Sequence, residues 1–289
     1  MIMKNPPAIL GKIAESTLTR VAKAKERLSL EQIQKNINHK GEKGAQRTED
    51  FSSSLPSAPS APLWLNKNIT FESAIASPGL SFICEVKKAS PSKGIIAPDF
   101  PWLEIAKEYE DGGAAAISVL TEPEFFLGSD QYLREISANV LIPTLRKDFI
   151  IDPYQIYEAK LWGAKAVLLI CALLEQDTLI SFQKIAKELE LDCLVEIHSE
   201  EEAEEALGAG ASFIGINNRD LTTFKVDTGL TARLRKLIPS GVLTVAESGI
   251  NNTDDIRELK DIGVDAVLIG ESLMRRTDRK EFLKELKSV

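Results

Sequence analysis

The sequence contains few of the residues that build metal sites and disulfides. It has two histidines and three cysteines among 289 residues. Cys84, Cys171 and Cys193 lie in or beside apolar runs, with no C-x-x-C spacing, which indicates reduced core thiols in a cytoplasmic protein. His198 and Glu201 suggest a metal, but no second ligand motif accompanies them, so we expect no metal site.

Other absences narrow the function. No stretch approaches about 18 uninterrupted apolar residues, and residues 1–15 lack a long apolar stretch with a cleavage site, so we expect neither a membrane span nor a secretory signal. No G-x-G-x-x-G follows a strand pattern, and Ser248 has no nearby His and Asp signature, so neither a dinucleotide nor a hydrolase triad is indicated. With 35 basic and 43 acidic residues, the net charge of -8 argues against nucleic acid or an anionic membrane as partner.

The N-terminal part of the chain predicts helices followed by a loop. Residues 38–62 are polar and rich in Ser and Pro, so they bury too little apolar surface to become ordered and predict a mobile loop. We therefore divide the chain into an N-terminal helical extension with a flexible Ser/Pro-rich segment (residues 1–70) and a catalytic domain (residues 71–289). One or two amphipathic helices are predicted over residues 8–37 by apolar positions at helical spacing: Ile9, Ile13, Leu18, Val21 and Ala22.

From residue 80 onward, short β-rich apolar runs alternate with segments of helical period. Alternation of this kind predicts βαβ crossovers and a parallel sheet that is buried on both faces. Eight such runs follow one another: LSFICEV, AAAISVL, VLIPTLR, AKAVLLI, CLVEIH, SFIGIN, LTVAES and DAVLIG.

Four glycines recur at a regular interval. Gly113, Gly163, Gly210 and Gly263 are separated by 50, 47 and 53 residues, and each stands where a helical pattern gives way to a strand pattern. We expect each to adopt a left-handed conformation at a helix C-terminus. The interval corresponds to two βα units, so it favours a closed (β/α)8 TIM barrel with an N-terminal helical extension over an open doubly wound sheet.

Charged and polar residues gather at the predicted carboxyl ends of five strands, where the working residues of such a barrel lie. Because side chains alternate along a strand, Glu85 and Lys87 should both face the barrel interior. A buried charge is costly unless it is paired, so this couple could be a purely structural ion pair. The whole set favours a catalytic pocket. The other strand ends contribute Lys147, Glu196, Asn217, Arg219, Glu247 and Ser248.

Two glycines follow the last two strand patterns. Gly249 and Gly270 would let backbone N–H groups approach an anion, and the loops after these strands are the usual phosphate site of this architecture. We therefore expect a small phosphorylated substrate, with the N–H of Glu271 as a donor and the side chain of Glu271 pointing away.

Five segments resemble the signature sequences of indole-3-glycerol-phosphate synthases. The resemblance covers residues 70–289, and the N-terminal helices resemble that family's helical cap, whereas residues 38–70 depart from it in length and in Ser and Pro content. It implies a cofactor-free enzyme that converts 1-(2-carboxyphenylamino)-1-deoxyribulose 5-phosphate into indole-3-glycerol phosphate, carbon dioxide and water. The segments are EVKKASPSKG (85–94), LRKDF (145–149), VEIH (195–198), GINNRDL (215–221) and AESGI (246–250).

The same resemblance implies roles for individual residues. Lys147 is the general acid that protonates the ketone oxygen, and Lys87 contacts substrate anions and shares or takes over proton donation. Burial and neighbouring cations are expected to lower the pKa of either lysine. Glu196 and Glu85 are candidates both for stabilising the cationic intermediate and for the dehydration step, and the sequence does not apportion these roles.

The remaining residues are expected to position the substrate. Asn217 and Ser248 belong to the catalytic set, and Arg219 suits bidentate binding of a carboxylate. Phe126, Phe149 and Leu168 match an apolar pocket for the anthranilate ring, although each could equally be ordinary core. The resemblance adds Ser90, Glu247, Gly249, Gly270 and Glu271 as substrate-binding residues.

Two other functions stay open at this point. One is a different phosphate-binding barrel enzyme, such as a sugar-phosphate isomerase or the lyase subunit of tryptophan synthase, against which the combination of Lys87, Lys147 and Glu196 argues. The other is a catalytically inactive barrel that serves as a scaffold, whose sign would be a lost strand-end charge. The acidic surface permits a monomer.

Overall fold

The computed structural model describes residue 4, residues 8–43 and residues 69–289. Most of the segment expected to be a mobile loop, residues 38–62, therefore lies outside the described residues. Its first residues are helical, which corrects the expected loop, because α2 (Leu30–Lys43) continues through them. The helix is free to continue because the first proline of this segment is Pro56, and proline is the residue that most strongly ends a helix.

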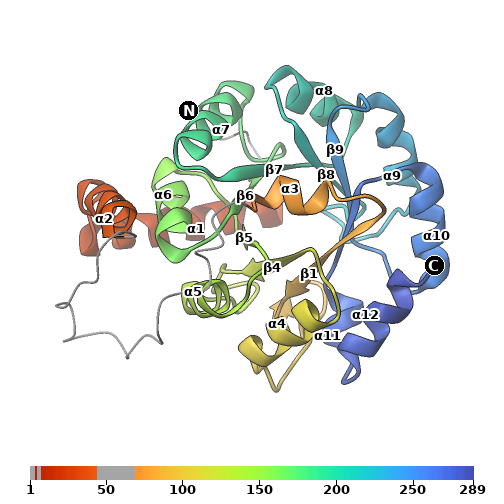
Figure 1. Cartoon of the computed structure of the whole chain (residues 1–289). Helices are drawn as coiled ribbons and strands as arrows, with labels where there is room; N and C mark the ends of the chain where they lie inside the picture. The colour runs from red at the N-terminus through yellow and green to blue at the C-terminus, as the bar shows by residue number, and fades with distance from the viewer. Residues whose placement is uncertain (1–3, 5–7, 44–68) are drawn as a thin grey trace.

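Eight parallel strands close into a barrel, in the order β1-β10-β9-β8-β7-β6-β5-β4 (Figure 1). The closed sheet confirms the predicted barrel and excludes the open sheet. One strand is shorter than its pattern predicted, because Pro143 has no N–H to donate and pairing begins only at Thr144. The strands are β1 (Ser81–Val86), β4 (Ala116–Leu120), β5 (Thr144–Lys147), β6 (Ala166–Ile170), β7 (Asp192–Ile197), β8 (Phe213–Asn217), β9 (Leu243–Glu247) and β10 (Ala266–Ile269).

Helices surround the barrel and cover the outer face of the sheet (Figure 1). Every residue of β1, β4, β6, β8 and β10 is buried, as the continuous apolar runs predicted. The helices are α4 (Trp102–Asp111), α5 (Asp130–Asn139), α6 (Pro153–Trp162), α7 (Gln176–Glu188), α8 (Glu200–Gly208), α9 (Gly229–Leu234), α10 (Thr253–Ile262), α11 (Glu271–Met274) and α12 (Arg279–Lys287), with a 3-10 turn η2 (Arg235–Leu237) after α9.

Two smaller elements lie at the ends of the strands. Helix α3 (Phe71–Ile75) covers the amino-terminal end of the barrel, where Phe71 packs against Phe213 at the start of β8, with ring centroids 5.9 Å apart. A two-stranded hairpin of β2 (Ala89–Ser90) and β3 (Gly94–Ile95) follows β1 at the opposite end. We call the end of the barrel where the strands have their carboxyl ends, with the loops that follow them, the mouth of the barrel.

The repeated glycines adopt the predicted conformation. Gly113, Gly163, Gly210 and Gly263 have φ values of 86°, 93°, 77° and 81°, which lie in the left-handed region that other residues rarely enter. Gly163 and Gly263 cap α6 and α10 directly, and their N–H groups donate to carbonyl groups of the last helical turn. The glycine repeat therefore marks the points where a helix stops and an even-numbered strand of the barrel begins.

The second N-terminal helix, α2, lies beside the barrel next to α6, and the first runs behind the barrel in Figure 1, against the loops at the carboxyl ends of β4 and β5. Helix α1 (Ala8–Arg27) buries Leu10, Ile13 and Ala14 in the main core, and Val21 in a second cluster with residues of α2 and α6. Leu18, which we expected on the apolar face, is 46% exposed, because the buried stripe runs one position away from it. No described helix is long and apolar enough to cross a membrane.

The left-handed cap of α10 can be tested by substitution. Gly263→Ala should lower the free energy of unfolding by about 1–2 kcal/mol, because its φ of 81° strains an L residue while no atom lies within 4 Å of the added Cβ. The control is Gly241→Ala, which also meets no atom within 4 Å and has no positive φ, so it should be neutral or stabilise by up to about 1 kcal/mol. Urea unfolding of both variants measures the difference, and equal losses would contradict the strain argument.

Candidate active site

Lys147 lies at the mouth of the barrel between carboxylates of two other strands. Its Nζ is 2.7 Å from Oε2 of Glu196 on β7 and 3.3 Å from Oε2 of Glu247 on β9. Burial alone would lower the pKa of Lys147, but the attraction of Glu196, Glu247 and Glu85 outweighs burial and raises it. The expected lowering is therefore wrong, because the groups around this lysine are carboxylates and not cations.

The two carboxylates that contact Lys147 have opposite pKa shifts. Burial raises the pKa of Glu247, and repulsion from Glu196 adds to it, so the value reaches about 8 despite Lys147. Burial would also raise the pKa of Glu196, but the closer Lys147 and the neighbouring His198 lower it well below the ordinary range. Of the two carboxyl groups, Glu196 therefore gives up its proton more readily than Glu247.

Glu247 occupies space that a glycine leaves free. A Cβ placed on Gly215 of β8 would lie 2.2 Å from Oε1 of Glu247, so no larger residue fits there without moving the carboxylate. This buried oxygen has no hydrogen-bond partner within the described part of the chain. Gly215 was not among the predicted site residues, although a glycine inside a strand pattern is a signal of close approach.

Glu85 and Lys87 form the predicted pair at the end of β1, with 2.5 Å between Nζ of Lys87 and Oε1 of Glu85. Gly270 lies against this pair, since a Cβ there would be 2.4 Å from Oε1 of Glu85 and 3.0 Å from Nζ of Lys87. The ion pair therefore requires a residue without a Cβ at position 270. The same glycine was predicted to let backbone N–H groups approach an anion. Glu85 is buried and Lys87 is half-buried, and the charge of Glu85 helps to raise the pKa of Lys147.

Asn217 and Ser248 meet between β8 and β9. Ser248 Oγ donates a hydrogen bond to Oδ1 of Asn217 at 2.9 Å, and the backbone N–H of Arg219 donates to the same oxygen at 3.1 Å. Ser248 has a φ of 66° and is followed by Gly249 with a φ of 85°. Two consecutive left-handed residues, the first of them not a glycine, are a costly backbone conformation that is typical of functional sites.

An apolar wall stands next to these polar groups. The rings of Phe126 and Phe149 lie with centroids 5.8 Å apart. The carboxylate of Glu122, missed by our sequence reasoning, organises the loop after β4 by accepting the N–H groups of residues 124, 125 and 126. Leu168 is buried on β6, opposite Leu194, and the alternation of side chains places both on the interior side, below Glu196.

The predicted phosphate-binding residues lie at the rim of the mouth. We expected the side chain of Glu271 to point away from a bound phosphate. Its carboxylate lies 3.5 Å from Nζ of Lys93 and 3.8 Å from a guanidinium nitrogen of Arg219. It also pairs with Arg275 at 3.1 Å, so three cations attract it. Ser90 lies half-buried in the hairpin after β1 and makes no side-chain hydrogen bond with the other predicted residues among those that the structure describes.

Sequence comparison with known proteins identifies the family. Residues 10–286 match the sequence model of a family described as indole-3-glycerol phosphate synthase. This chain belongs to the indole-3-glycerol phosphate synthase family.

Relatives that carry this family name cover nearly the whole chain. An indole-3-glycerol phosphate synthase of Ruminiclostridium cellulolyticum is 50% identical over 280 residues, which cover 96% of this chain and 98% of the relative. One from Endomicrobium trichonymphae is 52% identical over 280 residues, 96% of this chain and 99% of the relative. The high coverage includes the N-terminal extension as well as the barrel.

Solved structures of lower identity share the fold alone. A 3-hexulose-6-phosphate synthase from Salmonella typhimurium superimposes with a TM-score of 0.59 at 14% identity, over 72% of this chain and 97% of that one. A thiamine phosphate pyrophosphorylase from Pyrococcus furiosus gives a TM-score of 0.54 at 21% identity, over 72% and 94% of the two chains.

In this chain, an ion network lies next to Lys147 on the outer side of the sheet. The buried carboxylate of Asp148 accepts hydrogen bonds from both terminal guanidinium nitrogens of Arg20 on α1, at 2.9 and 2.7 Å, and from Thr121 Oγ1 at 2.6 Å. Arg146 lies 3.1 Å from Asp148 and stacks on Trp162 of α6. Burial would raise the pKa of Asp148, but the two arginines outweigh burial and lower it.

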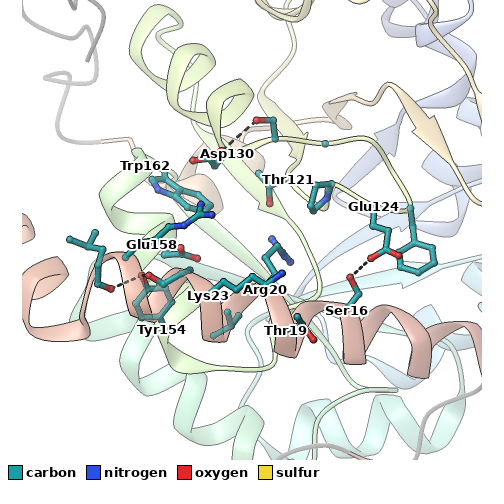
Figure 2. A pocket seen from close by; sticks show the side chains of 18 of the residues that line it. Ser16, Thr19, Arg20, Lys23, Thr121, Glu124, Asp130, Tyr154, Glu158 and Trp162 are labelled. Atoms are coloured by element: carbon teal, nitrogen blue, oxygen red, sulfur yellow. Dashed lines mark hydrogen bonds between the residues drawn. The ribbon is translucent and has the colours of Figure 1, made fainter. Parts of the chain in front are cut away.

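A cleft of about 1040 Å³ opens beside the mouth, between α1, the loop after β4, and α5 and α6. Figure 2 shows Ser16 and Glu124 joined by a hydrogen bond across this cleft, with Trp162 on the far wall. None of the predicted site residues lines it, so the cleft does not mark the catalytic centre. Arg20 and Thr121 do line it, and both bind Asp148, so the network around Asp148 separates the cleft from the site of Lys147.

The link from α1 to Asp148 should contribute to stability. Arg20→Met should lower the free energy of unfolding by about 2–3 kcal/mol at pH 7, because it removes two charge-assisted hydrogen bonds from a buried carboxylate. The control is Lys25→Met, which removes another ion pair of α1, the more exposed pair with Asp152 at 2.7 Å, and should cost at most about 1 kcal/mol.

The pH dependence of this difference has a defined sign. Because the folded pKa of Asp148 is lowered, its contribution is present above the ordinary carboxyl pKa and is lost as the pH falls toward the folded value. The stability gap between the wild type and Arg20→Met should therefore narrow below about pH 4. Urea unfolding across this range measures it, and a gap that widens in acid would contradict the assignment.

Proposed function

We propose that this chain closes the indole ring of indole-3-glycerol phosphate, starting from 1-(2-carboxyphenylamino)-1-deoxyribulose 5-phosphate, as a step of tryptophan biosynthesis. Membership of the indole-3-glycerol phosphate synthase family supports this reaction directly. The geometric observation that carries the proposal is the contact of Lys147 with Glu196 and Glu247. It supplies a cationic acid and two carboxyl groups whose pKa values are shifted in opposite directions within one site.

Ring closure begins with proton donation by Lys147. The ammonium transfers a proton to the ketone oxygen while the aromatic carbon that bears the carboxylate forms a bond to the ketone carbon. The oxygen becomes a hydroxyl group, the amine of Lys147 becomes neutral, and the ring carries a positive charge. Glu196, which is 2% exposed and ionised, stabilises this charge electrostatically because water does not screen it.

The later steps restore the aromatic ring. The carboxylate leaves as carbon dioxide and its bonding electrons return to the ring. Dehydration follows when an acid protonates the leaving hydroxyl group and a carboxylate accepts a proton from the new ring. Lys87 and Glu85 at 2.5 Å form a second acid and base couple for this step, and Glu196 remains the alternative base.

The surrounding residues suit the other parts of the substrate. The Phe126 and Phe149 pair, with Leu168 beneath, offers an apolar surface to the anthranilate ring. Arg219 and Asn217 orient the carboxylate and the hydroxyl groups, and Ser248 holds Asn217 through its hydrogen bond. Backbone N–H groups near Gly249, Gly270 and Glu271 would receive the phosphate together with Lys93 and Ser90. In this proposal the protein acts as a cytoplasmic monomer without a cofactor.

The activity can be assayed directly. The purified chain, treated with EDTA, should convert the carboxyphenylamino ketose phosphate into a product with indole fluorescence and release one carbon dioxide per indole formed. Substrate incubated without protein is the control for spontaneous reaction. Failure to form indole with the folded wild-type chain would overturn the proposed function, and a requirement for added metal would overturn the cofactor-free mechanism.

Lys147 is the residue whose loss should be most damaging. Lys147→Ala should lower kcat by at least about 100-fold, the usual contribution of a positioned general acid. The control is Lys160→Ala, which removes a lysine from an exposed ion pair with Glu190 and should leave kcat unchanged. Near-normal turnover of Lys147→Ala in the same fluorescence assay would contradict its role.

A further inference from the structure

His198 lies just beyond the end of β7, between two carboxylates. Its Nε2 is 3.4 Å from Oε1 of Glu196, and its Nδ1 is 3.2 Å from Oε2 of Glu202 on α8. The same oxygen of Glu202 accepts the backbone N–H of His198 at 2.7 Å. Only 13% of the histidine side chain is exposed, so water does not supply alternative partners on these sides.

We propose that His198 is a permanently protonated positioning residue, which holds Glu196 ionised and oriented while Lys147 is without its proton. The proposal deepens the proposed function and rests on it. It assigns no contact between His198 and the substrate, and no transfer of a proton from the imidazole.

The geometry favours an imidazolium. An ionised carboxylate only accepts hydrogen bonds, and a neutral imidazole carries a single N–H donor. His198 faces a carboxylate oxygen with each ring nitrogen: Nδ1 is hydrogen-bonded to Glu202, whereas Nε2 contacts Oε1 of Glu196 at ion-pair distance without a hydrogen bond. Both contacts are favourable when both nitrogens carry a proton. The charged groups around it are Glu196 on β7, Glu202 on α8 and Asp220 in the loop after β8, all of them acidic.

The electrostatic surroundings agree with this protonation state. Burial by itself would lower the pKa of His198, but the hydrogen bonds and the attraction of Glu196 and Glu202 outweigh burial and raise the pKa to about 10. Lys147 contacts the other oxygen of Glu196. Each oxygen of Glu196 therefore faces its own cation.

This arrangement matters at the moment of proton transfer. When Lys147 gives its proton to the ketone, it stops compensating the buried Glu196, and an uncompensated buried carboxylate tends to bind a proton. Protonated Glu196 would no longer stabilise the positive charge that forms on the substrate. The contact of His198 with Oε1 does not change in this step, so Glu196 stays ionised when its charge is needed.

The pH profile of kcat tests the proposal. His198→Gln removes the charge but keeps an amide donor, and His198→Phe removes both. Without the cation the pKa of Glu196 rises, so the acidic limb of the kcat profile should move up by at least about one pH unit in both variants. At neutral pH, kcat should fall about 10-fold or more, while KM changes less than about 3-fold because the histidine does not contact the substrate.

The control variant is His39→Gln, because His39 is the only other histidine of the chain, and it should have the wild-type profile. If His198 has only a structural role, both variants unfold at lower temperature while the acidic limb stays in place, and that result would overturn the proposal. A limb that moves in His198→Phe but not in His198→Gln would also overturn it, because the charge would then not matter.

A spectroscopic measurement reads the protonation state without activity. In the His39→Gln variant, His198 is the sole histidine, so its ring nitrogen and carbon-bound proton NMR signals are assigned without ambiguity. They should show the imidazolium form from about pH 6 to about pH 9, a range that extends well above the ordinary histidine pKa. Titration near about pH 6.5 would overturn the proposal even if the synthase assay succeeds, whereas failure of that assay alone would refute the proposed function.

Discussion

The ammonium group of Lys147 is buried in the interior of a parallel barrel, and an unpaired charge there would cost several kcal/mol. Its neighbours on β4 and β6 do not supply the compensation. The partners come from β7 and β9, whose strand ends project Glu196 and Glu247 across the barrel. A closed barrel is the arrangement that makes such pairing possible, because strands far apart in the sheet face one another across its axis. The catalytic group and the fold are therefore linked through one set of charges.

Because side chains alternate along β5, the need to compensate buried charge extends to the outside of the barrel. Arg146 and Asp148 flank Lys147 in the sequence, so their side chains lie on the helix side of the sheet when Lys147 faces the interior. Both are buried there, and each has a second partner of opposite charge, which is Arg20 for Asp148 and Glu158 for Arg146. Helix α1 thus acts on the strand that carries the catalytic lysine, which gives the N-terminal extension a physical connection to the active site.

The sequence was sufficient for features that depend on local pattern. Eight apolar runs and four glycines at regular intervals predicted the strands and the left-handed helix ends, because burial and φ are decided within a few residues. The alternation of side chains at the end of β1 likewise predicted that Glu85 and Lys87 could pair. The pKa of Lys147 was predicted in the wrong direction because it depends on carboxylates 49 and 100 residues away along the chain, whose distances no local pattern contains. The partnership of Arg20 with Asp148, separated by 128 residues, was missed for the same reason.

Glycine in this site has a second function besides backbone freedom. Gly215 and Gly270 have no positive φ, yet a Cβ at either position would collide with a carboxylate oxygen of Glu247 or Glu85. Each glycine therefore determines how deeply its glutamate enters the barrel, and hence the distance from that carboxylate to a lysine. Because the pKa of a buried carboxylate depends steeply on that distance, Gly215 contributes to the pKa of Glu247, while Gly270 determines how closely Glu85 approaches Lys87. The opposite pKa shifts of two chemically identical residues then follow from their surroundings, since Glu196 lies closer to Lys147 and also faces His198, whereas Glu247 lies farther from the same lysine.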